Sequence, residues 1–176
     1  MKDSLNYLEF GAGGSTFLGI IHSNCKVHSV ESDKNWVKYL RYWKIIRKKE
    51  KNKQLEFHHI NIGKTVEWGF PKDNNMYDNY PNYSKEIFTK IDTKSLDTVF
   101  IDGRFRVACA LSTILNCNND IKILIHDYPN REQYKILEKY LDLVELVDRL
   151  AIFKIKSDID YSSVLSLYED YKFIPD

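Results

Sequence analysis

The feature that most constrains this chain is the glycine cluster that ends its first apolar run. Residues 5–10 are mostly apolar, and residues 11–16 read GAGGST. An apolar run that stops at glycines is typical of a buried strand entering a tight turn. Glycines let the backbone approach a ligand closely, and Ser15 or Thr16 can cap the helix that follows. The chain is therefore expected to begin with a strand, a ligand-binding loop and a helix.

Strand-like and helix-like segments then alternate along the chain. Five strands are expected at residues 5–10, 26–31, 55–62, 97–101 and 121–125. After the helix that follows the first strand, further helices are expected at residues 33–53, 106–115 and 131–141. This alternation predicts a parallel sheet with helices on both faces.

The last part of the chain breaks the alternation. Residues 143–147 and 151–156 read as strands, and the connection between them is too short for a parallel crossover. They are expected to form an antiparallel hairpin, and residues 161–171 a short helix. The predicted fold class is α/β, a single doubly wound, mostly parallel sheet that ends in this hairpin.

Length and composition set the organisation of the chain. The 176 residues fit one domain, residues 1–176, with one core. Residues 63–94 are rich in aromatic side chains and lack clear periodicity. A segment of that length in a compact domain is usually functional, so we expect an aromatic-rich lid there.

Charge and cysteine content narrow the class of protein. The formal net charge of +1 argues against a general binder of nucleic acid. The three cysteines have no metal-ligand spacing, and their odd number predicts reduced thiols in a cytoplasmic protein: Cys25, Cys109 and Cys117. No apolar run is long enough to span a bilayer, and the polar N-terminus does not read as a signal sequence.

Two acidic residues near the glycine loop indicate the kind of ligand. Glu9 lies two positions before Gly11, where a carboxylate would repel phosphate but suit a cationic amino or sulfonium group. A dinucleotide fingerprint would also need a third glycine where Thr16 stands. Glu31 ends the second strand, 20 positions after Gly11, where an acid binds ribose hydroxyls in such folds or supports the next helix. A nucleoside that carries a cationic group fits this pattern.

A third set of polar residues follows the fourth and fifth strands. Asp102 ends the fourth strand, and His126 and Asp127 end the fifth. Because ligands of such sheets bind at the carboxyl ends of the strands, these residues are candidate catalytic groups. A histidine beside a carboxylate can serve as a general base, and two carboxylates can instead share a divalent cation. Arg104 and Arg106 can pair with a carboxylate or bind an anionic part of a substrate.

The remaining histidines have no ligand spacing and are expected to be structural: His22, His28, His58 and His59.

Four stretches of this sequence carry a resemblance to a known family. They read EFGAGGST, HSVESD, VFIDGRFRVACAL and ILIHDYPNREQY. Together they resemble the signatures of class I, Rossmann-like S-adenosylmethionine-dependent methyltransferases, over most of residues 5–153. In outline the chain is similar to small-molecule and sugar O-methyltransferases.

The resemblance implies that the cofactor is S-adenosylmethionine. The implied cofactor site consists of Glu9, Gly11, Ala12, Gly13, Ser15, Thr16, Glu31, Ser32, Asn61, Ile62 and Asp102. In the family, the first acid and the glycines contact the methionine moiety, the second acid holds the ribose, and residues 61–63 here would lie near the adenine. Metal-dependent relatives place acids where Asp102 and Asp127 stand, so Mg²⁺ or Mn²⁺ is an alternative to a histidine base.

The expected activity is O-methylation of a sugar or glycan hydroxyl. A hydroxyl is a poor nucleophile until it loses its proton, so the reaction needs a base or a metal. Expected acceptor contacts are Arg104, Arg106, Tyr128, Trp68 and Tyr80. Two alternatives stay open: another small-molecule acceptor, or a non-catalytic cofactor-binding partner of a glycan-synthesis enzyme. Nucleic-acid methylation is disfavoured because no Asp/Asn-Pro-Pro-aromatic motif follows the fourth strand.

Overall fold

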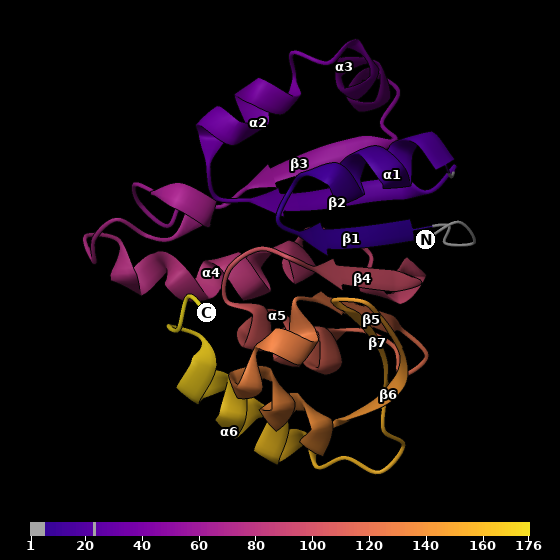
Figure 1. The fold of residues 1–176 in the computed structure, drawn as a ribbon, viewed down its shortest axis with the longest axis vertical. Helices are drawn as coiled ribbons and strands as arrows, with labels where there is room; N and C mark the ends of the chain where they lie inside the picture. The colour runs from indigo at the N-terminus through magenta and orange to yellow at the C-terminus, as the bar shows by residue number, and fades with distance from the viewer. Residues whose placement is uncertain (1–5, 23) are drawn as a thin grey trace.

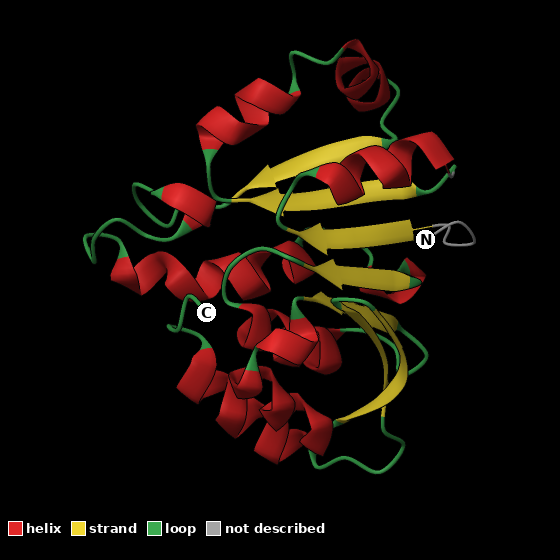
Figure 2. Ribbon diagram, in the orientation of Figure 1, coloured by secondary structure: helices red, strands yellow, loops and turns green. Residues whose placement is uncertain are grey.

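The computed structural model describes residues 6–22 and 24–176, which contain one sheet of seven strands (Figures 1 and 2). The strands are β1 Asn6–Phe10, β2 Lys26–Glu31, β3 Leu55–His59, β4 Thr98–Ile101, β5 Lys122–His126, β6 Leu141–Val147 and β7 Leu150–Ile155. Their order is β3-β2-β1-β4-β5-β7-β6, and β1 to β5 are parallel. β7 runs antiparallel to both β5 and β6. The predicted α/β class with a C-terminal antiparallel hairpin is confirmed.

Helices cover both faces of the sheet. The α-helices are α1 Gly14–His22, α2 Lys34–Leu40, α3 Lys44–Lys51, α4 Tyr80–Lys85, α5 Arg106–Asn116 and α6 Tyr161–Tyr171. The short 3₁₀ helices are η1 Glu67–Gly69, η2 Tyr77–Asn79, η3 Glu86–Thr89, η4 Thr93–Ser95, η5 Tyr128–Asn130 and η6 Glu132–Lys139. Residues of α1 and α3 pack on one face, and residues of α4, α5 and α6 pack on the other. In the described part of the chain, every helix is too short or too polar to cross a membrane.

The helix predicted at residues 33–53 is two helices. α2 ends at Leu40 and α3 begins at Lys44, with a turn between them. The guanidinium group of Arg47 donates hydrogen bonds to the backbone carbonyls of Arg41 and Tyr42 in this turn. These bonds help to satisfy carbonyls near the end of α2. The helix predicted at residues 131–141 is largely the 3₁₀ helix η6, Glu132–Lys139.

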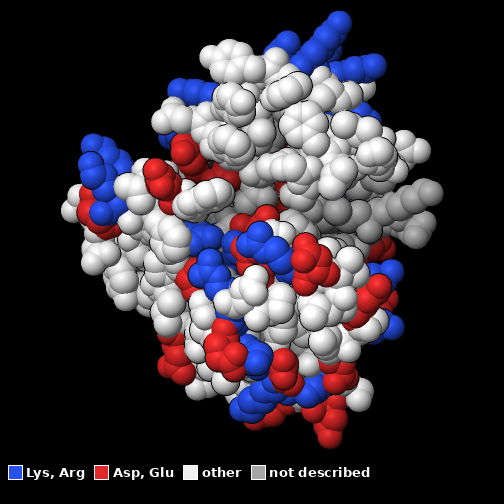
Figure 3. Space-filling model, in the orientation of Figure 1, with Lys and Arg blue, Asp and Glu red and all other residues white. Residues whose placement is uncertain are grey.

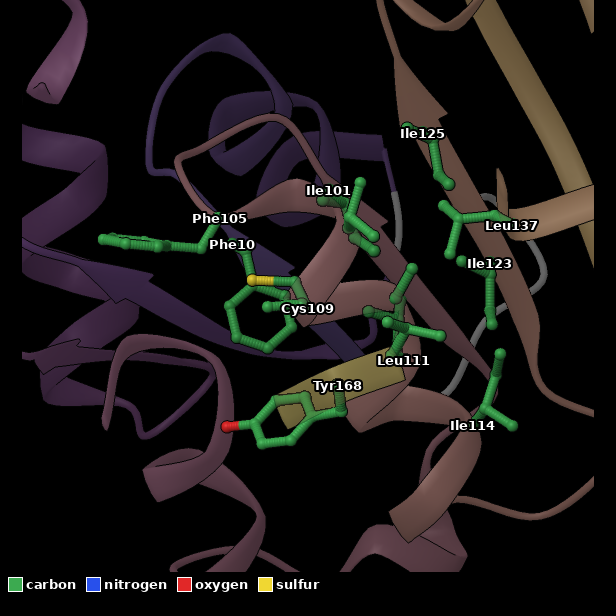
Figure 4. Packing of buried hydrophobic residues seen from close by; sticks show 14 of the residues in the cluster. Phe10, Ile101, Phe105, Cys109, Leu111, Ile114, Ile123, Ile125, Leu137 and Tyr168 are labelled. Carbon is green, nitrogen blue, oxygen red and sulfur yellow. The ribbon is translucent and has the colours of Figure 1, made fainter. Parts of the chain in front are cut away.

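The larger core surrounds α5. Figure 4 shows Cys109 and Leu111 of this helix between Ile101 of the sheet and Tyr168 of α6, all within one buried cluster. The helix is buried along most of its length, which agrees with its apolar sequence on all sides. Both faces of α5 are therefore occupied, and its first turn is held at the carboxyl end of β4.

The predicted lid at residues 63–94 has two parts. Tyr80, Tyr83, Ile87 and Phe88 are buried in the larger core, so α4 and η3 are structural elements. The earlier part contains η1, where Trp68 is 85% exposed. Only this earlier part is exposed enough to act as a movable cover.

The N-terminus of α5 is capped from the far end of the sequence. Phe105 precedes the helix with a left-handed φ of 56° and provides no side-chain cap. The backbone N–H groups of Arg106 and Val107 instead donate to the carboxylate of Asp176, at 2.5 and 3.3 Å. A carboxylate at this position satisfies free N–H groups and interacts favourably with the helix dipole.

We predict that Asp176→Ala lowers the free energy of unfolding by about 1–2 kcal/mol, because it removes a helix cap. Urea denaturation followed by circular dichroism measures this change. Asp158→Ala, at an exposed loop position, is the matched control and is expected to change stability by less than about 0.5 kcal/mol. Equal stability of the two variants would contradict the assigned cap.

Candidate active site

A cavity of about 600 Å³ lies at the carboxyl ends of the parallel strands. Its walls are residues 11–15, 31–33, 66–69, 102–104 and 126–127, with Trp36, Tyr83, Arg106 and Arg149. Figure 3 shows acidic and basic side chains side by side in the hollow at the middle of the face that it presents. This is the edge where open α/β sheets bind ligands, and the volume suits a small-molecule site.

The glycine loop forms one wall of the cavity. Gly11 has a φ of 96°, and a Cβ atom there would lie 2.6 Å from the backbone nitrogen of Gly103. A Cβ atom at Gly13 or Gly14 would meet no heavy atom within 4 Å. Gly11 is therefore required by backbone packing, whereas Gly13 and Gly14 leave open space for a ligand to approach the backbone.

Glu31 joins the glycine loop to the end of β2. Its carboxylate accepts hydrogen bonds from the backbone N–H groups of Ala12, Ser32 and Asp33, at 3.1, 2.7 and 2.9 Å. Burial raises the pKa of Glu31, while these N–H donors oppose the shift. The residue lines the cavity and also organises the loop, so its two predicted roles are compatible.

Trp36 is a cavity residue that the sequence pattern did not reveal. Its indole N–H donates to the backbone carbonyl of Ala12 at 2.7 Å, and the ring lines the cavity. Asp33 caps α2 by accepting from the N–H of Asn35 at 2.7 Å, which places Trp36 in the first turn. The sequence could have indicated this role, because Trp36 lies three positions after the capping residue Asp33, at the edge of the sheet where ligands bind.

Glu9 and Thr16 do not reach the cavity, contrary to the prediction that they contact a cofactor. Both are fully buried, and Glu9 accepts hydrogen bonds from the hydroxyls of Tyr7, Ser15 and Thr16. Side chains alternate along a strand, so Glu9 shares with Tyr7 the sheet face that α1 covers. Burial raises the pKa of Glu9 to about 7, while the hydrogen bonds from Thr16, Ser15 and Tyr7 oppose the shift. Glu9 therefore supports the start of α1.

The residues predicted near the adenine are divided between the core and a second cavity. Ile62 is fully buried in the larger core. Asn61 lines a neighbouring cavity of about 450 Å³, whose walls also include Ser32 and Asp33. Only Asn61 of this pair is therefore placed to meet a ligand that extends from the first cavity.

Asp102, His126 and Asp127 converge at the opposite wall. His126 Nδ1 lies 3.1 Å from Asp102 Oδ1 and 3.3 Å from Asp127 Oδ1. The side chain of His126 is 34% exposed, so it is accessible from the cavity. The carboxyl ends of β4 and β5 thus bring together the three predicted catalytic residues.

Two arginines hold these carboxylates. Buried Arg106 lies 3.2 Å from Asp102 and 3.4 Å from Asp127, and it donates to the backbone carbonyl of His126 at 2.7 Å. Arg149, in the turn between β6 and β7, also pairs with Asp127. Burial by itself raises the pKa of Asp127, but the interaction with His126 and the positive charges of Arg106 and Arg149 lower it below its ordinary value. Asp127 is therefore ionised at neutral pH.

The structure places some of the predicted acceptor residues at the cavity and others away from it. Arg104 lines the cavity, is 5% exposed, and stacks on Phe70 with its guanidinium carbon 4.2 Å from the ring centre. Its Nε and Nη1 atoms have no hydrogen-bond partner among the described residues. Trp68 lies at the rim, with a left-handed φ of 61°.

Tyr80 and Tyr128 lie outside the cavity. The hydroxyl of Tyr80 donates to the carbonyl of Asp73 at 2.9 Å, and that of Tyr128 donates to Glu138 at 2.7 Å. Both rings are buried, at 2% and 4% exposure, so the structure does not place these two predicted acceptor contacts at the cavity. Tyr83 instead supplies the buried aromatic wall, because its hydroxyl lies against the backbone at Gly103.

Solved structures share this fold. A methyltransferase-like protein from Silicibacter pomeroyi is 28% identical to the chain with a TM-score of 0.82, over 99% of this chain and 90% of that protein. An RNA methyltransferase from Salinibacter ruber, solved with S-adenosyl-L-homocysteine, is 13% identical with a TM-score of 0.51, over 90% and 85% of the two chains. The chain therefore has the fold of S-adenosylmethionine-dependent methyltransferases, as predicted.

The spermidine synthase from Thermotoga maritima also shares the fold, at 14% identity and a TM-score of 0.50, over 92% of this chain and 56% of that one. No protein-family model and no curated protein matches the chain. Since one fold serves several reactions, the reaction depends on the site.

We predict that Glu9→Gln reduces the pH dependence of stability. Between pH 4.5 and about 7 the folded state retains the Glu9 proton and the unfolded state loses it, so the free energy of unfolding falls as pH rises. The variant is expected to lack this fall, of about 3 kcal/mol, in urea titrations at about pH 5 and about pH 8. The exposed control Glu145→Gln should show the same dependence of unfolding free energy on pH as the parent. The same dependence in Glu9→Gln would refute the raised pKa assigned to Glu9.

Proposed function

We propose that this protein is an S-adenosylmethionine-dependent methyltransferase that methylates a hydroxyl group of a small polar acceptor. One observation carries the proposal: a single cavity has the glycine loop and Glu31 on one wall and the Asp102, His126 and Asp127 cluster on the other. A nucleoside site and a proton acceptor therefore face the same space.

The first wall fits the cofactor. The open space beside Gly13 and Gly14 admits a ligand close to the backbone, and the Glu31 carboxylate is fixed by three N–H donors in position to accept from ribose hydroxyls. Trp36 adds an aromatic surface beside the loop. When bound, S-adenosylmethionine supplies an activated methyl group on a sulfonium. The chain has to hold and orient the two partners and remove a proton.

The second wall fits a general base. With Nδ1 of His126 beside two carboxylates, its Nε2 is the nitrogen that accepts the proton of the acceptor hydroxyl. Asp102 and Asp127 place negative charge beside Nδ1, which stabilises the imidazolium ion that forms. Arg106 and Arg149 keep Asp127 in place and ionised throughout.

The same wall does not fit Mg²⁺ or Mn²⁺ well. Asp102, His126 and Asp127 are close enough together to ligate one ion. However, Arg106 contacts both carboxylates and Arg149 contacts Asp127, so guanidinium groups already balance the negative charge of these acids. A divalent cation would have to displace them against charge repulsion. The histidine base is therefore the version that the geometry favours.

The cavity wall also suggests the acceptor class. Trp68, at the cavity rim, provides an exposed aromatic surface that can pack on the apolar face of a sugar ring, and carboxylates nearby can bind its hydroxyls. Arg104 has unpartnered N–H groups and suits an anionic substituent. We therefore propose a sugar or glycan acceptor, with another small hydroxyl compound as the alternative.

The cofactor assignment predicts that Glu31→Gln weakens binding of S-adenosylhomocysteine by about 10- to 100-fold, because ribose loses a charged partner. Isothermal titration calorimetry measures this affinity, and circular dichroism checks that the loop change leaves the fold intact. Glu145→Gln, on the exposed edge strand, is the matched control and should bind like the parent. Unchanged affinity in Glu31→Gln would remove this residue from the cofactor site.

The base assignment predicts that His126→Asn slows turnover by about 10²- to 10⁴-fold while cofactor affinity is retained. Release of S-adenosylhomocysteine with hydroxyl acceptors that the parent consumes measures turnover. A chelator should leave the parent fully active, and His22→Asn, on the exposed end of α1, should be unaffected. If activity vanishes with chelator and returns with Mg²⁺, a metal ion rather than His126 activates the hydroxyl.

A further inference from the structure

A second group of metal-ligating side chains lies on the neighbouring strands β2 and β3. None of its members, His28, Glu56 and His58, lines the cofactor cavity. In the strand register, His28 pairs with Glu56, and Val30 pairs with His58. Alternate residues share a face of a sheet, so all three side chains lie on the same face. The expectation that the two histidines are merely structural rested on their sequence spacing, which does not show strand pairing.

We propose that His28, Glu56 and His58 bind a divalent transition-metal ion, with Zn²⁺ as the preferred cation. His28 Nδ1 lies 3.1 Å from His58 Nε2 and 3.6 Å from Glu56 Oε2, and His58 Nε2 lies 4.0 Å from Glu56 Oε1. Neighbouring donor atoms of a tetrahedral zinc ion are about 3.3–3.5 Å apart, given its usual bond lengths. Small side-chain rotations therefore suffice to place all three donors around one ion.

The donor set determines the class of cation. Two imidazole nitrogens and one carboxylate oxygen are typical ligands of Zn²⁺ and related first-row ions, whereas Mg²⁺ and Ca²⁺ prefer oxygen alone. The histidine side chains are 7% and 8% exposed. Burial lowers the pKa of His28 to about 4 and also lowers that of His58, so both rings are neutral at pH 7. Neutral imidazole is the form that binds a metal.

The surroundings of the cluster permit a bound cation. Lys90, whose charge acts on His58, is paired with Glu86, which limits its repulsion. The charge of Lys26 acts on both histidines. The side chain of Glu56 is 53% exposed, so an ion can enter from solvent. Three protein ligands leave a fourth position for water.

The consequence of binding is structural. β3 is an edge strand that pairs with β2 alone, and an ion held by His28 of one strand and by Glu56 and His58 of the other would crosslink them. An ion that binds the folded state stabilises it in proportion to its affinity and concentration. Because the cluster shares no residue with the cavity walls, the inference is independent of the proposed methyltransferase activity.

Titration of tag-free, chelator-treated protein with ZnCl₂ tests the inference by isothermal calorimetry. We expect one Zn²⁺ per chain and a rise in Tm. His58→Gln and Glu56→Gln should each weaken binding by at least about 10-fold. Asp102→Asn, in the cavity cluster, and His22→Gln, on exposed α1, are matched controls that should bind Zn²⁺ like the parent.

Substitution with Co²⁺ adds a spectroscopic measurement. A four-coordinate site with two imidazoles should give strong visible absorption that is lost in Glu56→Gln, a half-exposed position where the fold should survive even if His58→Gln does not. Failure of Zn²⁺ to bind would overturn the inference and leave a plain His28–His58 hydrogen bond. Binding that persists in Glu56→Gln, or that is lost in Asp102→Asn, would also overturn it.

Discussion

The close contact between the backbones at Gly11 and Gly103 is the constraint on which the site depends. A Cβ atom at Gly11 would lie 2.6 Å from the nitrogen of Gly103, and one at Gly103 would lie 2.1 Å from the hydroxyl of Tyr83. Side chains at either position would push the ends of β1 and β4 apart. Because the glycines permit this contact, the loop after β1 and Asp102 after β4 face the same cavity.

Arg106 provides the corresponding constraint between β4 and β5. Its guanidinium group is buried, and it bridges the carboxylates of Asp102 and Asp127 while donating to the backbone carbonyls of Gly103 and His126. A buried charge with so many partners is costly to move, so it defines the separation of the two strand ends. The same contacts supply positive charge to the acids, which favours a histidine base over a divalent cation.

Local sequence patterns were sufficient for most of the fold. The alternation of apolar runs and helices predicted five parallel strands, and the short link after β6 predicted the antiparallel pair, because these patterns arise from burial and chain length. The break between α2 and α3 was missed, since it depends on the contacts of the Arg47 side chain with two carbonyls. The core role of α4 was missed as well, because its burial depends on contacts with α5 and α6.

For the site, the sequence by itself determined which residues stand at the ends of the strands: the glycine loop, Glu31, Asp102, His126 and Asp127. A strand end is a local property, and parallel pairing carries it to one edge. Only the tertiary structure decided where the side chains point. It turned Glu9 towards α1, buried Tyr80 and Tyr128 elsewhere, and brought Arg149 to Asp127. It also placed His28 beside His58, because contacts across strands depend on register and packing, which no sequence spacing records.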